Sequence, residues 1–177
     1  LGDVGGTTLT ALKLLGKEIS EIGIFDPNEA QCRRYEIELN QVLSLDGVPL
    51  PKIFICPKER LFDCDVFLFT ASRGVPAVGS QVKDVRMAQF SLNREMLLSY
   101  AKQARKAGFM GLFCQISDPV DQLCRVVFLH SNRDEQGNFD AAGLLPEQIQ
   151  GFGLGVMAAR AAYYAEKERI DFSQGRA

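Results

Sequence analysis

Apolar residues along the chain gather in two kinds of segment, and the two kinds alternate. Short continuous apolar runs predict strands at residues 19–25, 53–56, 66–71, 109–116 and 148–152. Apolar residues at helical spacing predict helices at residues 9–15, 29–43, 82–106, from about 119 onward and 155–167. Strands that are apolar at every position are typical of parallel sheets covered on both faces, joined by right-handed crossovers through helices. The sequence therefore predicts a doubly wound α/β fold.

One polar segment interrupts this alternation. Residues 131–143 (SNRDEQGNFDAAG) contain glycines and few large apolar side chains, so we expect a loop inserted between a helix and a strand. The single histidine of the chain, His130, directly precedes this segment. We expect it to be a capping or solvated residue at the end of a helix.

Composition and charge narrow the classes of function. The chain has 177 residues, 46% of them hydrophobic, which is enough for one domain with a substantial core. It carries 20 basic and 22 acidic side chains without a basic cluster, which argues against nucleic acid as a partner. No apolar run approaches the roughly 18 residues that span a bilayer, and no secretory signal opens the chain. We expect a cytoplasmic protein that does not contact a membrane.

The five cysteines are an odd number at irregular spacing, mostly within apolar segments. We expect buried, reduced thiols, as in a cytosolic protein. No CxxC pair occurs, and a zinc site would have only one histidine to use. We therefore expect no metal site.

The opening residues LGDVGG lead directly into the first predicted helix. Gly2, Asp3, Val4 and Gly5 match the last four positions of the motif GxGxxG, whose first glycine would precede Leu1. In that motif the glycines allow a tight turn, close approach of the backbone to a pyrophosphate, and tight packing of helix on strand. The helix N-terminus attracts the phosphate charge. A plain glycine-rich turn is the alternative interpretation.

An acidic residue at the end of the next strand matches the second half of this motif. Asp26 follows the glycines at close to the roughly 20 residues expected, and its carboxylate can accept hydrogen bonds from both ribose hydroxyls. It would repel a 2′-phosphate, so NAD is favoured over NADP, and we expect the nearby Arg33 and Arg34 to be solvated. The alternative is that Asp26 caps the following helix. The combined motif predicts a Rossmann-type dinucleotide-binding domain.

In this fold the strand before the glycine turn lies in the middle of the sheet. We expect a strand of about five apolar residues before Leu1 in the gene product, since the middle strand must be long enough to pair with both neighbours. Without that strand, residues 1–177 are expected to form a split sheet with two unpaired strand edges.

Four later segments extend the pattern: TASRGVPAVG at 70–79, Arg86 followed two helical turns later by Asn93, ISDPVD at 116–121, and GFGLGVMAAR at 151–160. The first is similar to the TAG-type turn of one family, and the second to that family's mobile-loop arginine and helix asparagine. The third and fourth are similar to its VSNPVD and GSGTxLDxAR segments. With them, nearly the whole chain resembles the N-terminal, nucleotide-binding half of the lactate/malate dehydrogenase family. The resemblance implies that residues 1–160 form an NAD-binding domain and that residues 161–177 begin the connection to a substrate domain.

The activity that the resemblance implies is hydride transfer between NAD and C2 of a small 2-hydroxy or 2-oxo acid. It also implies a homodimer or homotetramer. The residues that it implies for cofactor binding are Gly2, Asp3, Val4, Gly5, Asp26, Thr70, Ala71, Ser72, Asn93 and Ser117.

The resemblance also implies a set of substrate residues, namely Arg73, Arg86, Asp118 and Arg160. Arg160 matches the arginine that binds the substrate carboxylate, for which a bidentate guanidinium is suited. Arg86 matches the arginine that polarises the carbonyl as a loop closes. The alternative for each is a surface arginine, and the interval from Arg73 to Arg86 is about twice as long as the family's.

Two departures from the family pattern affect the chemistry. Asp118 stands where the family has an asparagine, and an anion there would repel a substrate carboxylate. Met157 stands where the family has the aspartate that orients the catalytic histidine, and a thioether cannot stabilise an imidazolium. No Asp or Glu occurs between Gln148 and Ala165. The family's histidine would lie beyond Ala177.

Three hypotheses therefore stay open. The first is an NAD-dependent 2-hydroxy acid dehydrogenase, which Arg86, Arg160 and the glycine–aspartate motif favour. The second is an NAD-binding protein without the acid/base relay, which Met157 and Asp118 favour. The third is a Rossmann-type binder of another adenine nucleotide, which leaves the later motifs unexplained.

Overall fold

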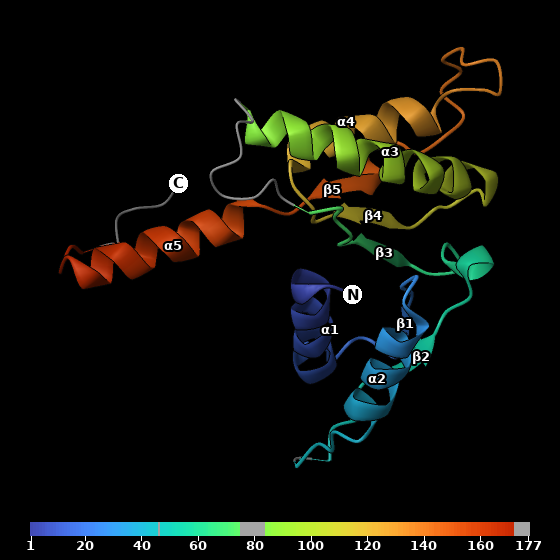
Figure 1. The fold of residues 1–177 in the computed structure, drawn as a ribbon. Coiled ribbons are helices and arrows are strands. Elements are labelled where there is room, and N and C mark those ends of the chain that lie inside the picture. Colours follow the sequence, from blue (N-terminus) through green and yellow to red (C-terminus); the bar gives the residue numbers. More distant parts are fainter. Residues whose placement is uncertain (46, 75–83, 172–177) are drawn as a thin grey trace.

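The computed structural model describes residues 1–45, 47–74 and 84–171. The helices and strands predicted from the apolar pattern are all present, with their ends shifted by a few residues (Figure 1). In chain order they are α1 (Asp3–Leu15), β1 (Glu21–Ile24), α2 (Glu29–Asn40), β2 (Lys52–Ile55), β3 (Val66–Phe69), α3 (Val85–Lys106), β4 (Leu112–Gln115), α4 (Val120–Ser131), β5 (Ile149–Gly151) and α5 (Leu154–Lys167). Two short 3-10 turns precede β3 and β5, at Lys58–Arg60 and Pro146–Gln148.

The strands of the described residues form two separate parallel sheets. β1 pairs with β2, and β3, β4 and β5 pair in that order, so the prediction of parallel strands is confirmed. β1 and β3 do not pair with each other in the part of the chain that the structure describes. The expected split of the sheet is therefore confirmed, and Figure 1 shows the β1–β2 part lying beside the β3–β5 part.

Helices α3 and α4 pack side by side over one face of the β3–β4–β5 sheet (Figure 1). The core beneath them is aromatic: Phe113 is fully buried, and its ring contacts those of Phe67 and Phe62. Burying each such side chain stabilises the fold by about 1.5–3 kcal/mol. Val66 and Leu112, which alternate with these aromatic residues, stay 49% and 42% exposed. α3 and α4 share one face, and on the opposite face Cys114 is buried, so that second face is covered in part.

A smaller core joins α1 and α2 to the β1–β2 sheet. Its buried members are Leu9, Ile24, Cys32, Leu39 and Ile53. Lys13 is also buried there, and its Nζ donates to the carbonyl oxygen of Pro51 at 2.7 Å.

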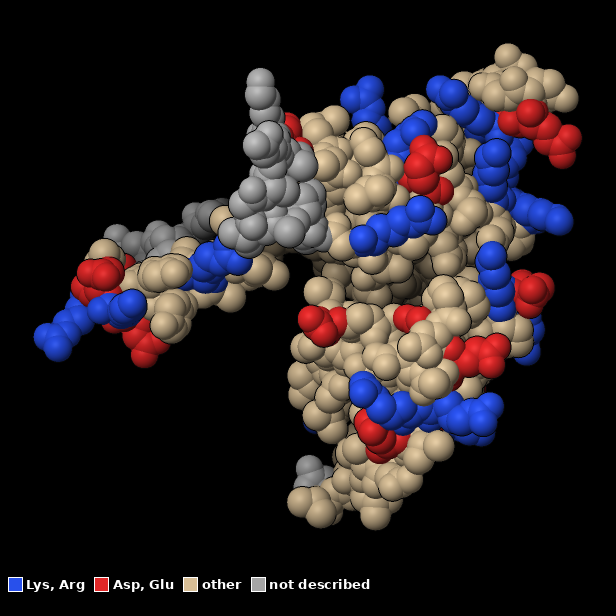
Figure 2. Space-filling view, in the orientation of Figure 1, with Lys and Arg blue, Asp and Glu red and all other residues tan. Residues whose placement is uncertain are grey.

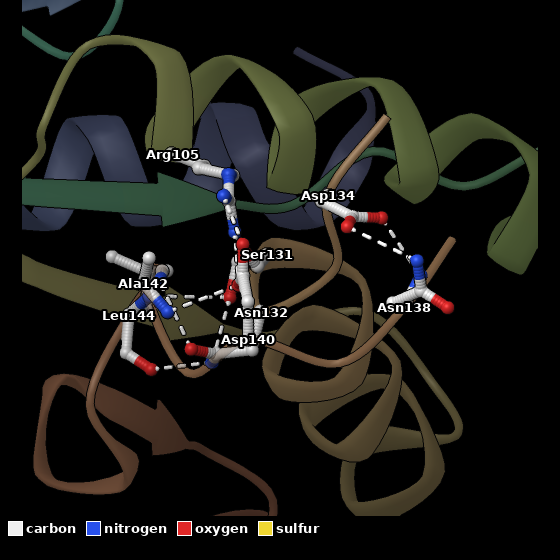
Figure 3. Close-up of polar contacts among 9 residues, drawn as sticks. Arg105, Ser131, Asn132, Asp134, Asn138, Asp140, Ala142 and Leu144 are labelled. Atoms are coloured by element: carbon white, nitrogen blue, oxygen red, sulfur yellow. Dashed lines mark hydrogen bonds and ion pairs between the residues drawn. The ribbon is translucent and has the colours of Figure 1, made fainter. Parts of the chain in front are cut away.

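The polar segment after α4 is a loop, as predicted, and it is well ordered by hydrogen bonds. Arg133 and Phe139 form an isolated antiparallel bridge, and the side chain of Asn132 bonds to the main chain on both sides of the loop. Arg105 of α3 forms a bidentate ion pair with Asp140 at 2.6 and 2.7 Å (Figure 3). These bonds fix the loop at the end of the sheet where β4 and β5 begin.

The five cysteines are free thiols. Cys32, Cys56 and Cys114 are buried as expected, whereas Cys124 is half-buried and Cys64 is exposed. Burial of the sulfur nevertheless raises the pKa of both Cys64 and Cys124 to about 11. At neutral pH these thiols are therefore protonated and weakly nucleophilic. No helix among the described residues is long and apolar enough to span a membrane.

Helix α5 leaves the sheet and projects away from the rest of the chain (Figure 1). Large apolar side chains on it are exposed, among them Leu154 (85%), Val156 (62%) and Tyr163 (61%). The boundary expected after Arg160 falls within this continuous helix.

Candidate functional site

The N-terminus of α1 lies against the carboxyl end of β3. A Cβ atom added at Gly5 would lie only 2.7 Å from the Oγ1 of Thr70, the residue that follows β3. Any side chain at this position would push the helix away from the strand. This is the close packing of helix on strand that the last glycine of a dinucleotide-binding motif permits.

The first turn of α1 is open to solvent and carries no side-chain cap. Gly2 is its N-cap residue, and a Cβ atom added there would meet nothing within 4 Å. Asp3 and Val4 are exposed beside it. The first N–H groups of a helix lack intrahelical partners and carry partial positive charge, so this turn offers unpaired donors for an anion.

Asp26 lies beside this turn, directly after β1. Its Oδ2 accepts from the main-chain nitrogen of Leu1, and its Oδ1 accepts from the N–H of Asn28 at 2.8 Å. The cap of α2 is Asn28, whose side chain accepts from the N–H of Gln31, so Asp26 is not the capping residue.

A second polar cluster joins the carboxyl ends of β3 and β4 through α3. Asn93 of α3 is fully buried, and its Oδ1 accepts from the N–H of Arg73 at 2.9 Å. Its Nδ2 donates to the carbonyl oxygen of Asp118 at 2.8 Å, and the Oγ of Ser72 lies 3.3–3.4 Å from both amide atoms. One side chain thus binds the segments that follow two different strands.

Ser117 makes a second connection between the same two segments. It is nearly buried, and its Oγ donates to the carbonyl oxygen of Ala71 at 2.7 Å. Gln115, at the end of β4, is fully buried and donates from Nε2 to the carbonyl oxygen of Ser117. Its Oε1 has no hydrogen-bond partner among the described residues. Sequence reasoning missed Gln115, although a lone amide at the end of the apolar run LFCQ was a usable signal.

The remaining residues proposed for substrate binding at this edge are exposed. Arg73 and Asp118 project from the two joined segments, and Arg86 lies in the first turn of α3, two turns before Asn93. Residues 75–79 of the expected turn TASRGVPAVG lie outside the described residues. Figure 2 shows a furrow between the part of the molecule that carries α1 and β1 and the part that carries α3, with charged side chains near both rims.

The structure does not bring every expected residue to this edge. Arg160 and Met157 lie on α5, which projects away from the sheet, and Met157 is 56% exposed. His130 lies in the last turn of α4 and is half-buried; burial, and after it nearby cationic side chains, lower its pKa.

No protein-family model matches this sequence, and no curated protein sequence matches it. Solved structures do match. A lactate dehydrogenase, MGS-M5, from a Medee basin deep-sea metagenome library has a TM-score of 0.71 at 22% identity over 96% of this chain and 49% of its own. Malate dehydrogenase from Plasmodium falciparum in complex with NADH has a TM-score of 0.68 at 17% identity over 97% and 48%. Lactate dehydrogenase from Eimeria maxima with NADH and oxamate has a TM-score of 0.64 at 18% identity over 96% and 46%.

The chain has the Rossmann-type fold of these dehydrogenases. It spans about half the length of each, and at these identities the likeness concerns the fold. A Rossmann-type sheet binds dinucleotides in the crevice where its strand order reverses, at the carboxyl ends of the strands. In this chain Gly5, Asp26 and Thr70 gather between the β1–β2 sheet and the β3–β4–β5 sheet, at the carboxyl ends of β1 and β3.

Proposed function

We propose that this chain is the NAD-binding half of a dehydrogenase. The observation that carries the proposal is the position of Asp26, whose carboxylate lies beside the uncapped N-terminus of α1, between the two parallel sheets. A diphosphate is an anion that fits the open N–H groups of a helix, and a ribose presents hydroxyl donors that fit a carboxylate. The helix N-terminus and the Asp26 carboxylate are adjacent, as the diphosphate and the ribose are in a dinucleotide.

The described residues fit NAD in two further respects. Gly2 leaves room above the turn, so the diphosphate would approach the N–H groups of residues 2–5 closely. The carboxylate of Asp26 would repel a 2′-phosphate, which selects NAD over NADP. The second nucleotide half would lie along residues 70–72, Asn93 and Ser117, at the ends of β3 and β4.

We further propose a small 2-hydroxy or 2-oxo acid as the substrate. A bound nicotinamide supplies hydride chemistry, and Arg73 and Arg86 at the sheet edge would supply cationic groups; Arg160 would join them only if α5 moved toward that edge. Support comes from neighbours that are lactate and malate dehydrogenases, one of them solved with NADH and oxamate. We also propose self-association into a dimer or tetramer, which would cover exposed apolar side chains of α5.

A second candidate is an NAD-binding protein that does not transfer hydride. Met157 favours it, because a thioether on α5 cannot orient or charge a catalytic histidine. No acidic residue between Gln148 and Ala165 could replace it.

Calorimetric titration of the chain with NADH and with NADPH tests the proposal. The wild-type chain is expected to bind NADH saturably and more tightly than NADPH. Asp26→Ala is expected to weaken NADH binding about tenfold or more, because hydrogen bonds to a charged group contribute about 1.5–3 kcal/mol, and to lose the preference over NADPH. Glu38→Gln, an exposed acid on α2, is the matched control and should change neither.

Absence of saturable NADH binding by the wild-type chain would contradict the proposal. Turnover of NADH with a panel of 2-oxo acids, measured on the full-length protein, separates the two candidates. Turnover above background supports the dehydrogenase, and binding without turnover supports the second candidate.

A further inference from the structure

The side chain of Asn93 has no hydrogen-bonding capacity left for a ligand. A carboxamide has two N–H donors and two acceptor lone pairs. In this chain the oxygen accepts from the N–H of Arg73, the nitrogen donates to the carbonyl oxygen of Asp118, and the hydroxyl of Ser72 lies within hydrogen-bond distance of both. The residue is 0% exposed. A direct contact with a bound molecule would require breaking one of these bonds.

The bonds of Asn93 connect segments that are far apart in sequence. Arg73 follows β3, and Asp118 follows β4, 20 and 25 positions away from Asn93. Hydrogen bonds of this kind contribute about 0.5–1.5 kcal/mol each to stability, so the two bonds favour one placement of the segments relative to α3. The segments carry the exposed side chains of Arg73 and Asp118 at the carboxyl edge of the sheet.

The position of Asn93 on α3 adds a third connection. Arg86 precedes it by two helical turns and therefore lies on the same side of the helix. Fixing Asn93 to the segments after β3 and β4 thus fixes where the first turns of α3 stand relative to them.

We propose that Asn93 is a positioning residue that sets the relative placement of the segments after β3 and β4, so that they form the site for the nicotinamide half of the dinucleotide. The proposal rests on the proposed function, since it assigns how one half of that site is built. It differs from direct cofactor binding by Asn93, because the amide acts only through Ser72, Arg73 and Asp118. The adenosine half, at Gly2–Gly5 and Asp26, does not depend on it.

The test compares two ligands, NADH and ADP, on wild type, Asn93→Ala and Asn93→Asp. ADP has the adenosine and the diphosphate but no nicotinamide. Asn93→Ala is expected to raise the Kd for NADH about tenfold and to leave the Kd for ADP within about twofold. Asn93→Asp keeps the side-chain volume but places a buried carboxylate oxygen against the carbonyl oxygen of Asp118, so it should show the same selectivity with at least as large a loss.

Asn132→Ala is the matched control. Asn132 is 2% exposed and also bonds to the main chain through both amide atoms, but it does so in the loop after α4. Its loss should destabilise the chain without changing the ratio of the two Kd values. Hydrogen exchange of ligand-free Asn93→Ala should be faster at residues 72–74 and 116–118 than in wild type, whereas loss of a direct contact would leave the free protein unchanged.

Several results would overturn the proposal. Equal weakening of NADH and ADP, an unchanged ratio, or unaltered exchange at residues 72–74 and 116–118 would each do so. If both Asn93 variants fail to fold while Asn132→Ala folds, Asn93 is required for folding and has no separate positioning role. If the wild-type chain binds neither ligand, the proposed function fails instead.

Discussion

Two buried asparagines stand at opposite ends of the β3–β4–β5 sheet, and they differ in what surrounds them. Asn132 lies in the loop after α4, where Arg105 and Asp140 pair with each other and Asn132 bonds to the main chain of Leu144 (Figure 3). Asn93 lies at the carboxyl edge, beside exposed charged side chains and the buried, unpartnered oxygen of Gln115. A buried asparagine fixes the main chain at both ends of the sheet, the closed end at Asn132 and the open end at Asn93, but the open end, at the carboxyl edge, also holds one buried oxygen that has no hydrogen-bond partner among the described residues. Unused groups of this kind are expected where a ligand binds.

Substitution of Gly143 tests the closed end and has the largest expected effect on stability. A Cβ atom at Gly143 would overlap the carbonyl group of Ser131, so Gly143→Ala must displace the main chain. We expect a loss of about 2–3 kcal/mol, or a fall in Tm of roughly 5–10 °C, measured by thermal unfolding. NADH affinity at temperatures where the variant is folded should be unchanged.

Gly5→Ala is the counterpart at the open end. Its Cβ would lie 2.7 Å from the Oγ1 of Thr70, so α1 must move away from β3, and the gain in helix propensity of about 1 kcal/mol offsets the cost of that movement. Stability should therefore change little, while the shift of α1 from β3 should weaken NADH binding about tenfold. The distinction between the two ends fails if Gly5→Ala lowers stability as much as Gly143→Ala and leaves binding intact.

The third prediction concerns how stability depends on acid pH, and its expected effect is smaller. It involves the ion pair of Arg105 and Asp140 at the closed end. Hydrogen bonds from Arg105 lower the pKa of Asp140 to about 2 from its ordinary 3.8. A lowered carboxyl pKa stabilises the fold above the unfolded pKa, so this contribution is present above about pH 4 and is lost as the pH falls toward 2. Asp140→Asn should reduce the slope of urea midpoint against pH in that window, and it should leave NADH affinity at pH 7 unchanged. An undiminished slope would show that the pair does not contribute.

The sequence predicted the order of elements because apolar runs and helical spacing are local properties of the chain. Gly5 and Asp26 were predictable for the same reason, since a short motif places them next to a turn and a strand end. The roles of Asn93 and Asn132 were not visible, because each bonds to groups that only packing brings near. Arg105 and Asp140, for example, are 35 positions apart in the sequence.

Hydrogen exchange with and without NADH tests the central claim most directly, since it reports on both ends of the sheet at once. If the open end binds the dinucleotide, NADH slows exchange at residues 2–6, 72–74 and 116–118 and leaves residues 132–144 unchanged. Protection confined to residues 132–144, or no protection anywhere at saturating NADH, would contradict it.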